Sequence, residues 1–122
     1  MTRVDFADAF QERIETIEAF MLLQDVSSAP GRMEALWEEI HRFRDLVMTH
    51  PRLGRPAEIL AAGSDQESAR LDDLLRLAVE AGVPDIREYV IHSHVILYAY
   101  SDSRVVVLSI RHQRELGYAD DE

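Results

Sequence analysis

The spacing of apolar residues changes at Pro84, from about 3.6 residues to about 2, and this change limits the folds open to the chain. Before Pro84, apolar side chains recur every three or four residues, as they do along one face of a helix. After it, runs rich in Val, Ile, Leu and Tyr alternate with short polar pieces, which is typical of strands. The sequence therefore predicts helices first and a sheet afterwards, an α+β fold.

Two amphipathic helices are expected in the N-terminal part of the chain. The first apolar stripe consists of Phe6, Phe10, Ile14, Ile17 and Met21, and the second of Met33, Leu36, Ile40, Phe43 and Val47. Between them, the segment 26–31 contains a proline and a glycine, which fit the start of a second helix better than the interior of a first. Because the connection is short, we expect the two helices to form an antiparallel hairpin.

A third helix is expected around residues 65–81. The second helix ends before it, because two prolines and a glycine in segment 51–56 cannot extend a helix. Ser64 and Glu67 have the spacing of a capping box, and the leucines that follow share one helical face. Gly82 supplies the stop.

Three strands are expected over residues 85–92, 95–101 and 104–112. The polar piece 101–103 is a suitable hairpin turn, so the three strands form an antiparallel meander. Both faces of the middle strand are apolar, which predicts that it is covered on both sides. We expect the helical hairpin to pack on a twisted antiparallel sheet of three to four strands, with residues 1–122 in one domain.

Composition excludes several classes of function. The chain has 23 acidic and 13 basic residues and a formal net charge of −10, which makes it a poor generic nucleic-acid binder. Every basic residue is an arginine, so chemistry that needs a lysine base or Schiff base is excluded. Cysteine is absent, and with it disulfides and thiolate nucleophiles. The N-terminus lacks a signal-peptide pattern and no apolar run has the length of a membrane span, so we expect a cytoplasmic protein.

Four short segments along the chain point to one protein family. They read H-P-R-L-G-R-P, I-R-E-Y, V-I-L-Y and I-R-H-Q-R, at residues 50–56, 86–89, 95–98 and 110–114. In this order they resemble the RelE/ParE superfamily of bacterial type II toxins, often described as plasmid stabilisation proteins. The resemblance covers nearly the whole chain and implies a short strand over residues 3–6 at the sheet edge. The connection over residues 57–83 is longer than usual in the family, so the third helix reads as an addition to it.

The resemblance implies a toxin that arrests growth and is neutralised by a cognate antitoxin. ParE-like members bind DNA gyrase and trap its cleavage complex, whereas RelE-like members enter the ribosome and cleave mRNA. Because this chain is acidic and has no lysine, we expect a ParE-like gyrase poison and not an enzyme. The ribosome-dependent endoribonuclease stays open as an alternative, and so does an inactive relative that only binds an antitoxin.

The resemblance also implies where the partners bind. An antitoxin segment is expected across an apolar groove between the helical hairpin and the sheet. A homodimer that covers the same groove is an alternative for the protein free of antitoxin. No cofactor is expected, since the chain has neither a glycine-rich phosphate loop nor a nucleophile elbow.

The candidate site residues differ between the two activities. For a gyrase poison, the residues expected to bind the target are Arg52, Arg55, Arg111, His112 and Arg114. For a nuclease, the matching candidates are Arg87, Arg111, His112, Arg114 and Tyr118. His112 is the proposed base or acid, because an imidazole titrates near neutrality. The structural alternatives are that Arg52 and Arg55 pair with acids on the helical hairpin and that His112 only makes hydrogen bonds within the fold.

A pair of histidines raises the question of a metal. His92 and His94 are two residues apart, the spacing of ligands on one face of a strand, and His112 is expected on a neighbouring strand. No carboxylate motif completes a ligand set, so we expect no metal site. Tyr98 and Tyr100 are expected in the core or on the face of the sheet.

Overall fold

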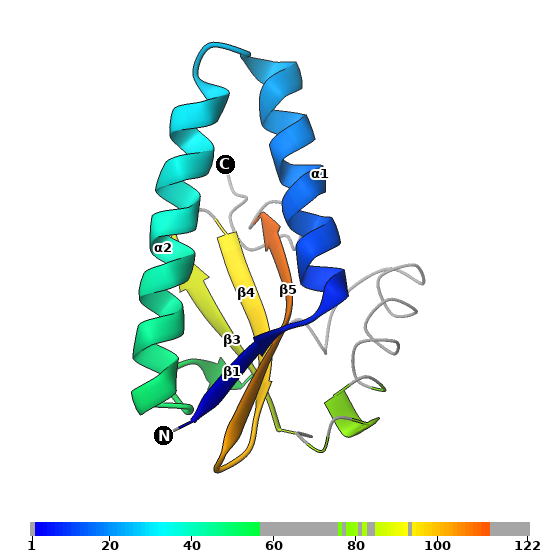
Figure 1. The fold of residues 1–122 in the computed structure, drawn as a ribbon, viewed down its shortest axis with the longest axis vertical. Coiled ribbons are helices and arrows are strands. Elements are labelled where there is room, and N and C mark those ends of the chain that lie inside the picture. The colour runs from blue at the N-terminus through cyan, green and yellow to red at the C-terminus, as the bar shows by residue number, and fades with distance from the viewer. Residues whose placement is uncertain are drawn as a thin grey trace.

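The computed structural model describes residues 2–56, 76, 78–80, 82, 85–92 and 94–112. Two helices lie over one face of a five-stranded sheet with the strand order β1-β5-β4-β3-β2 (Figure 1). The elements are β1 (Arg3–Phe6), α1 (Asp8–Gln24), α2 (Ala29–Thr49), β2 (Arg55–Pro56), β3 (Asp85–Ile91), β4 (His94–Tyr100) and β5 (Arg104–His112). The predicted α+β fold, a helical hairpin on a sheet, is confirmed.

The helical hairpin buries the two predicted stripes, with one exception. The buried residues are Phe10, Ile14, Ile17 and Met21 in α1, and Ala29, Met33, Leu36, Ile40, Phe43 and Val47 in α2. Phe6, which the stripe assigned to the first helix, lies instead in β1 with its ring centre 5.0 Å from that of Phe10. The sequence pattern was wrong here because a residue at the end of a strand packs on the same core as the helix that follows it.

The hairpin turn is held by one carboxylate. Asp25 accepts hydrogen bonds from the backbone N–H of Ser27 at 3.0 Å and from its hydroxyl at 2.7 Å. These bonds, together with weaker ones from Ser28, lower the pKa of Asp25. Pro30 then occupies the first turn of α2, where a missing N–H leaves no helical bond unmade.

Three strands form the predicted antiparallel meander, β3-β4-β5. The expected antiparallel sheet of three to four strands needs correction, because the sheet has five strands and is mixed. β1 occupies the implied edge position but runs parallel to β5, and the two-residue strand β2 pairs with β3. The chain reaches β5 from β1 only after the helices and other strands, so no hairpin turn fixes the relative direction of these two strands.

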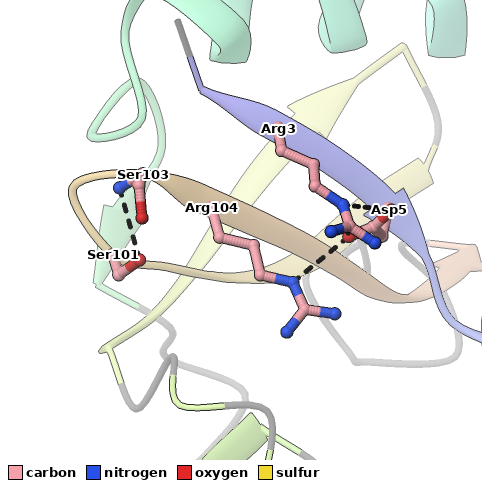
Figure 2. Close-up of polar contacts among 5 residues, drawn as sticks. All are labelled: Arg3, Asp5, Ser101, Ser103 and Arg104. Carbon is pink, nitrogen blue, oxygen red and sulfur yellow. Dashed lines mark hydrogen bonds and ion pairs between the residues drawn. The ribbon is translucent and has the colours of Figure 1, made fainter.

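Side chains also hold β1 to β5 (Figure 2). Asp5 lies between two arginines, with its Oδ2 atom 2.9 Å from Arg3 Nε and 3.2 Å from Arg104 Nε. Burial raises the pKa of Asp5, but the hydrogen bonds and charges of both arginines outweigh it and hold the pKa below its usual value. The parallel strands β1 and β5 are therefore also joined by a local ion-pair network.

The middle strand of the meander is buried along its whole length, as expected from its two apolar faces. Ile96, Tyr98 and Tyr100 pack in the core under the helical hairpin. On the opposite face, Leu97 and Ala99 belong to a second apolar cluster. β4 begins one residue earlier than predicted. Its two faces contribute residues to the two apolar clusters.

Part of the predicted third helix lies outside the described residues. Arg76 and residues 78–80 are helical, and Ala78 is buried in the second apolar cluster. The rest of the helix expected around residues 65–81, with Ser64 and Glu67, lies outside the described part of the chain. Among the described helices, none combines the length and apolar character that crossing a membrane requires.

Candidate functional site

A loop over residues 50–56 packs against β3 and β4, and we call this region the loop corner. The hydroxyl of Tyr98 joins the loop to the sheet: it accepts a hydrogen bond from Gly54 N–H at 2.8 Å and donates one to the Pro51 carbonyl at 2.8 Å. Burial raises the pKa of Tyr98, although the bond from Gly54 acts in the other direction. A phenol in the core therefore fixes the path of the loop.

Two arginines of the loop corner flank one ring. Arg87 Nη1 donates to the Gly54 carbonyl at 2.7 Å, and its guanidinium carbon lies 5.6 Å from the centre of the Tyr100 ring. The guanidinium carbon of Arg52, on the exposed side of the loop, lies 6.0 Å from the same centre. Both distances are within the range of cation–π attraction. Arg87 thus helps to hold the loop, while Arg52 faces solvent.

The third arginine of the loop corner neutralises a buried carboxylate. Arg55 Nε lies 2.7 Å from Glu88 Oε2, and the Glu88 side chain is 0% exposed. A buried carboxylate needs such a partner, because an unpaired charge in the interior is costly. Gly54 makes this close packing possible, since a Cβ at that position would lie 2.4 Å from the Glu88 carbonyl oxygen.

Three histidines gather at the other end of the meander. His94 and His112 are paired in register on β4 and β5, with their rings 5.2 Å apart and inclined by 75°. His92 lies in the β3–β4 turn with a positive φ of 43°. His94 is buried, His112 is half-buried and His92 is exposed. All three line a cavity of about 610 Å³.

The helical hairpin extends past the ends of the strands (Figure 1), and residues of both helices line the cavity together with the three histidines. Half of the helical residues that line it are apolar, and one of them is Phe20, which is 59% exposed. The other apolar lining residues are Ile17, Met21, Ala35 and Leu36. Among the polar lining residues, Arg13 donates from Nε to the Ile110 carbonyl at 3.3 Å and Arg32 donates to Gln24 at 3.2 Å. Among the described residues, Thr16, Gln24 and Glu39 also belong to the polar part of the lining. We call this feature the histidine cavity.

The candidate site residues fall into two groups. Arg52, Arg55 and Arg87 belong to the loop corner, whereas Arg111 and His112 lie at the far end of β5. Along β4, the partners of Arg87 and His112 are four residues apart, Tyr98 and His94, a separation of roughly 13 Å at about 3.3 Å per residue. The structure therefore does not bring Arg87 together with His112. Arg114 and Tyr118 lie outside the described residues.

Sequence reasoning missed the histidine cavity and the role of Tyr98 in the loop corner. The cavity combines Arg13, Arg32 and Glu39 with the three histidines, and these residues are far apart in sequence. One signal was present, because Phe20 is apolar and falls outside the buried stripe of α1. Within the described ranges, no group of three or more His, Asp or Glu side chains has an arrangement able to hold a metal ion.

Comparison with known proteins identifies the family of this chain. Over 92 residues, 75% of this chain, the sequence is 35% identical to an isocitrate dehydrogenase kinase/phosphatase of Paraburkholderia phytofirmans, but the match spans only 15% of that protein's length. The family model for the ParE toxin of the type II toxin–antitoxin system parDE matches residues 4–117, a range that includes the described strands and helices except the first residue of β1. The chain therefore belongs to the ParE toxin family of type II toxin–antitoxin systems.

Proposed function

We propose that this ParE-family toxin arrests growth by binding and poisoning DNA gyrase, and that it stabilises plasmids together with its antitoxin. The separation of Arg87 from His112 carries the proposal, because a nuclease needs its base, its phosphate-binding cation and its proton donor at one scissile bond. A gyrase poison needs only a folded surface that the target recognises. The net charge of −10 also disfavours docking on ribosomal RNA.

The proposed target-binding residues are Arg52, Arg55, Arg111, His112 and Arg114, and the described ones differ in accessibility. Arg52 is exposed and is the first to substitute. Arg55 is half-exposed but neutralises the buried Glu88, and Arg111 is only 5% exposed. Substitution of either changes packing as well as the surface, so a loss of activity there needs a measurement of stability beside it.

The second partner is the antitoxin, for which we propose a defined binding surface. We place its binding segment between the helical hairpin and the sheet, over the histidine cavity. Four apolar side chains near the hairpin turn are exposed: Phe20 by 59%, Leu22 by 42%, Leu23 by 85% and Val26 by 70%. Exposed apolar residues gathered in this way are typical of a surface that a partner covers. A homodimer free of antitoxin would cover the same surface.

Two assays test the target. Purified protein is added to gyrase acting on relaxed plasmid and, separately, to a translating ribosome extract. We expect supercoiling to be inhibited while mRNA stays intact; cleavage of mRNA in the ribosome with normal supercoiling would identify a RelE-type nuclease instead. Arg52→Glu should weaken the inhibition, and Arg44→Glu is the matched control because Arg44 is exposed on α2 and pairs only with its neighbour Asp45 in the described structure.

Expression in cells tests toxicity itself. We expect induction to stop growth and co-expression of the protein encoded beside it to restore growth. If expression leaves growth unchanged in a host with a related gyrase, the protein is an inactive relative that only binds an antitoxin.

A further inference from the structure

The histidine cavity has a charge opposite to that of the whole chain. Within the described structure, its lining holds two arginines, three histidines and one glutamate, so it carries +1 with neutral histidines and up to +4 when all three are protonated. The chain as a whole carries −10. The same lining includes apolar residues, among them Phe20 and Leu36. A ligand that fits both features is apolar at its centre and anionic at its edge.

We propose that the histidine cavity seats an apolar side chain of the antitoxin flanked by carboxylates, and that protonation of the histidines strengthens this binding. The inference rests on the proposed antitoxin surface between hairpin and sheet. Carboxylates beside the anchor meet Arg32, which is exposed on α2, and Arg13, which is half-buried on α1. Charge-assisted hydrogen bonds of this kind are stronger than neutral ones and fix orientation.

The imidazoles make the binding depend on pH. Among the described residues, the charged groups that line the cavity around His92, His94 and His112 are Arg13 from α1 and both Arg32 and Glu39 from α2. Carboxylates arriving with the antitoxin favour the charged imidazoles, so binding takes up protons and tightens as the pH falls.

The direction in which the affinity changes with pH distinguishes the proposal from its closest alternative. A purely apolar anchor would bury the imidazoles without bringing a negative charge. Burial alone favours the neutral form of histidine, so binding of such an anchor would weaken as the pH falls. A histidine side chain titrates between about pH 5 and about pH 8, so both directions are measurable in ordinary buffers.

The experiment measures the dissociation constant between the full-length toxin and the protein encoded beside it, at about pH 8 and about pH 6 and at one ionic strength. We expect the affinity to rise roughly threefold to tenfold on acidification, the effect of one or two partly exposed ion pairs. His112→Gln should reduce that rise, and combining it with His92→Gln and His94→Gln should remove it while binding at the higher pH remains. An affinity that falls or stays constant on acidification overturns the proposal.

Charge variants test the same proposal without touching a buried residue. Arg32→Glu should lower the affinity about tenfold at both pH values. Arg44→Glu makes the same change in net charge at an exposed position of α2 that does not line the cavity, and it should leave the affinity unchanged. Equal effects of the two variants would show that only overall charge matters and would overturn the proposal. Circular dichroism melts of each variant at both pH values establish that the fold is retained.

Two synthetic peptides serve as a further probe. Both carry the same leucines at helical spacing, flanked by glutamate in one and by lysine in the other. The glutamate peptide should bind more tightly, and the preference should be lost in Arg32→Glu; equal binding of both peptides contradicts the proposal. If the wild-type toxin binds the neighbouring protein at neither pH, the proposed neutralisation by that protein fails as well. If it binds with the wrong pH dependence, only the inference about the cavity fails.

Discussion

The loop corner and the histidine cavity lie at opposite ends of the same meander, and they use polar side chains differently. In the loop corner, Tyr98 bonds to two backbone groups of the loop and Arg87 bonds to a third. In the histidine cavity, charged and apolar side chains line a space of about 610 Å³ that opens beside the exposed Phe20. The loop corner holds parts of the fold together, whereas the histidine cavity presents charged and apolar side chains to a binding partner.

This difference changes how the arginines of the chain are interpreted. Arg55 and Arg87 lie in the segments that carry the family resemblance, yet both make close contacts within the fold. Arg13 and Arg32 lie in helices that gave no functional signal, yet both line the cavity. In an acidic protein, the position of an arginine relative to buried carboxylates and carbonyls therefore says more than its place in a motif.

The largest effect on stability is expected from Gly54→Ala in the loop corner. The added Cβ would lie 2.4 Å from the Glu88 carbonyl oxygen and 3.0 Å from the Tyr98 hydroxyl, so loop and strand must separate. We expect a loss of about 2–3 kcal/mol in the free energy of unfolding, measured by urea titration. Gly31→Ala is the control, because nothing lies within 4 Å of its added Cβ in α2. That variant should be neutral or more stable by less than about 1 kcal/mol; equal behaviour of the two variants would contradict the close packing of the corner.

A smaller loss is expected from Tyr98→Phe. The substitution keeps the ring and removes the hydroxyl that bonds to Gly54 and Pro51, so one backbone donor and one acceptor lose their partner. The expected cost is about 1–2 kcal/mol of unfolding free energy. Tyr89→Phe is the matched control, since Tyr89 contacts the core through its ring, 5.2 Å from that of Phe43. If both substitutions cost the same, the loop is not held by the Tyr98 hydroxyl.

Much of the fold could be predicted because it depends on local periodicity. The helix stripes from Phe10 to Met21 and from Met33 to Val47 are the buried faces, and the two apolar faces of β4 are both covered. The five-stranded mixed sheet could not be predicted in the same way. β2 has only two residues, one of them a proline, and the parallel pairing of β1 with β5 depends on contacts distant in sequence.

The candidate site was less predictable than the fold. Motif resemblance selected Arg87 and His112 together for a nuclease, but the register of the sheet places these two residues far apart along β4. Spacing did place His92 and His94 near His112, as the metal hypothesis required, although they line a cavity with arginines and apolar residues. The sequence shows which side chains are available for chemistry. It does not show that α1, α2 and three strand ends line one cavity, because this depends on the tertiary fold.

Acid conditions should weaken the edge of the sheet by a still smaller amount. Arg3 and Arg104 hold the pKa of Asp5 below its usual value of 3.8, so this carboxylate stabilises the fold above that pH. The contribution is lost as the pH falls below 3.8 through the lower pKa of the folded state. Because the side chains of Arg3 and Arg104 are 72% and 37% exposed, we expect less than about 1 kcal/mol.

Melting temperatures of wild type and Asp5→Asn between neutral pH and strong acid measure this contribution. The difference between the two proteins should shrink as the carboxylate becomes protonated. Asp102→Asn removes a carboxylate from the exposed β4–β5 turn and controls for the change in net charge. A difference that stays constant with pH would mean that the two arginines do not stabilise the edge through the charge of Asp5.

The smallest effect on stability is expected at the open end of the hairpin, where Phe20→Ser and Leu23→Ser form a matched pair. Both side chains are exposed, by 59% and 85%, so each substitution should change the unfolding free energy by less than about 0.5 kcal/mol. Only Phe20 lines the histidine cavity. Phe20→Ser should therefore weaken antitoxin binding about tenfold, the scale of one buried aromatic contact, while Leu23→Ser stays closer to wild type. A loss of stability in Phe20→Ser as large as that in Tyr98→Phe would mean that this end of the molecule completes the fold as the loop corner does, and the contrast between the two regions would not hold.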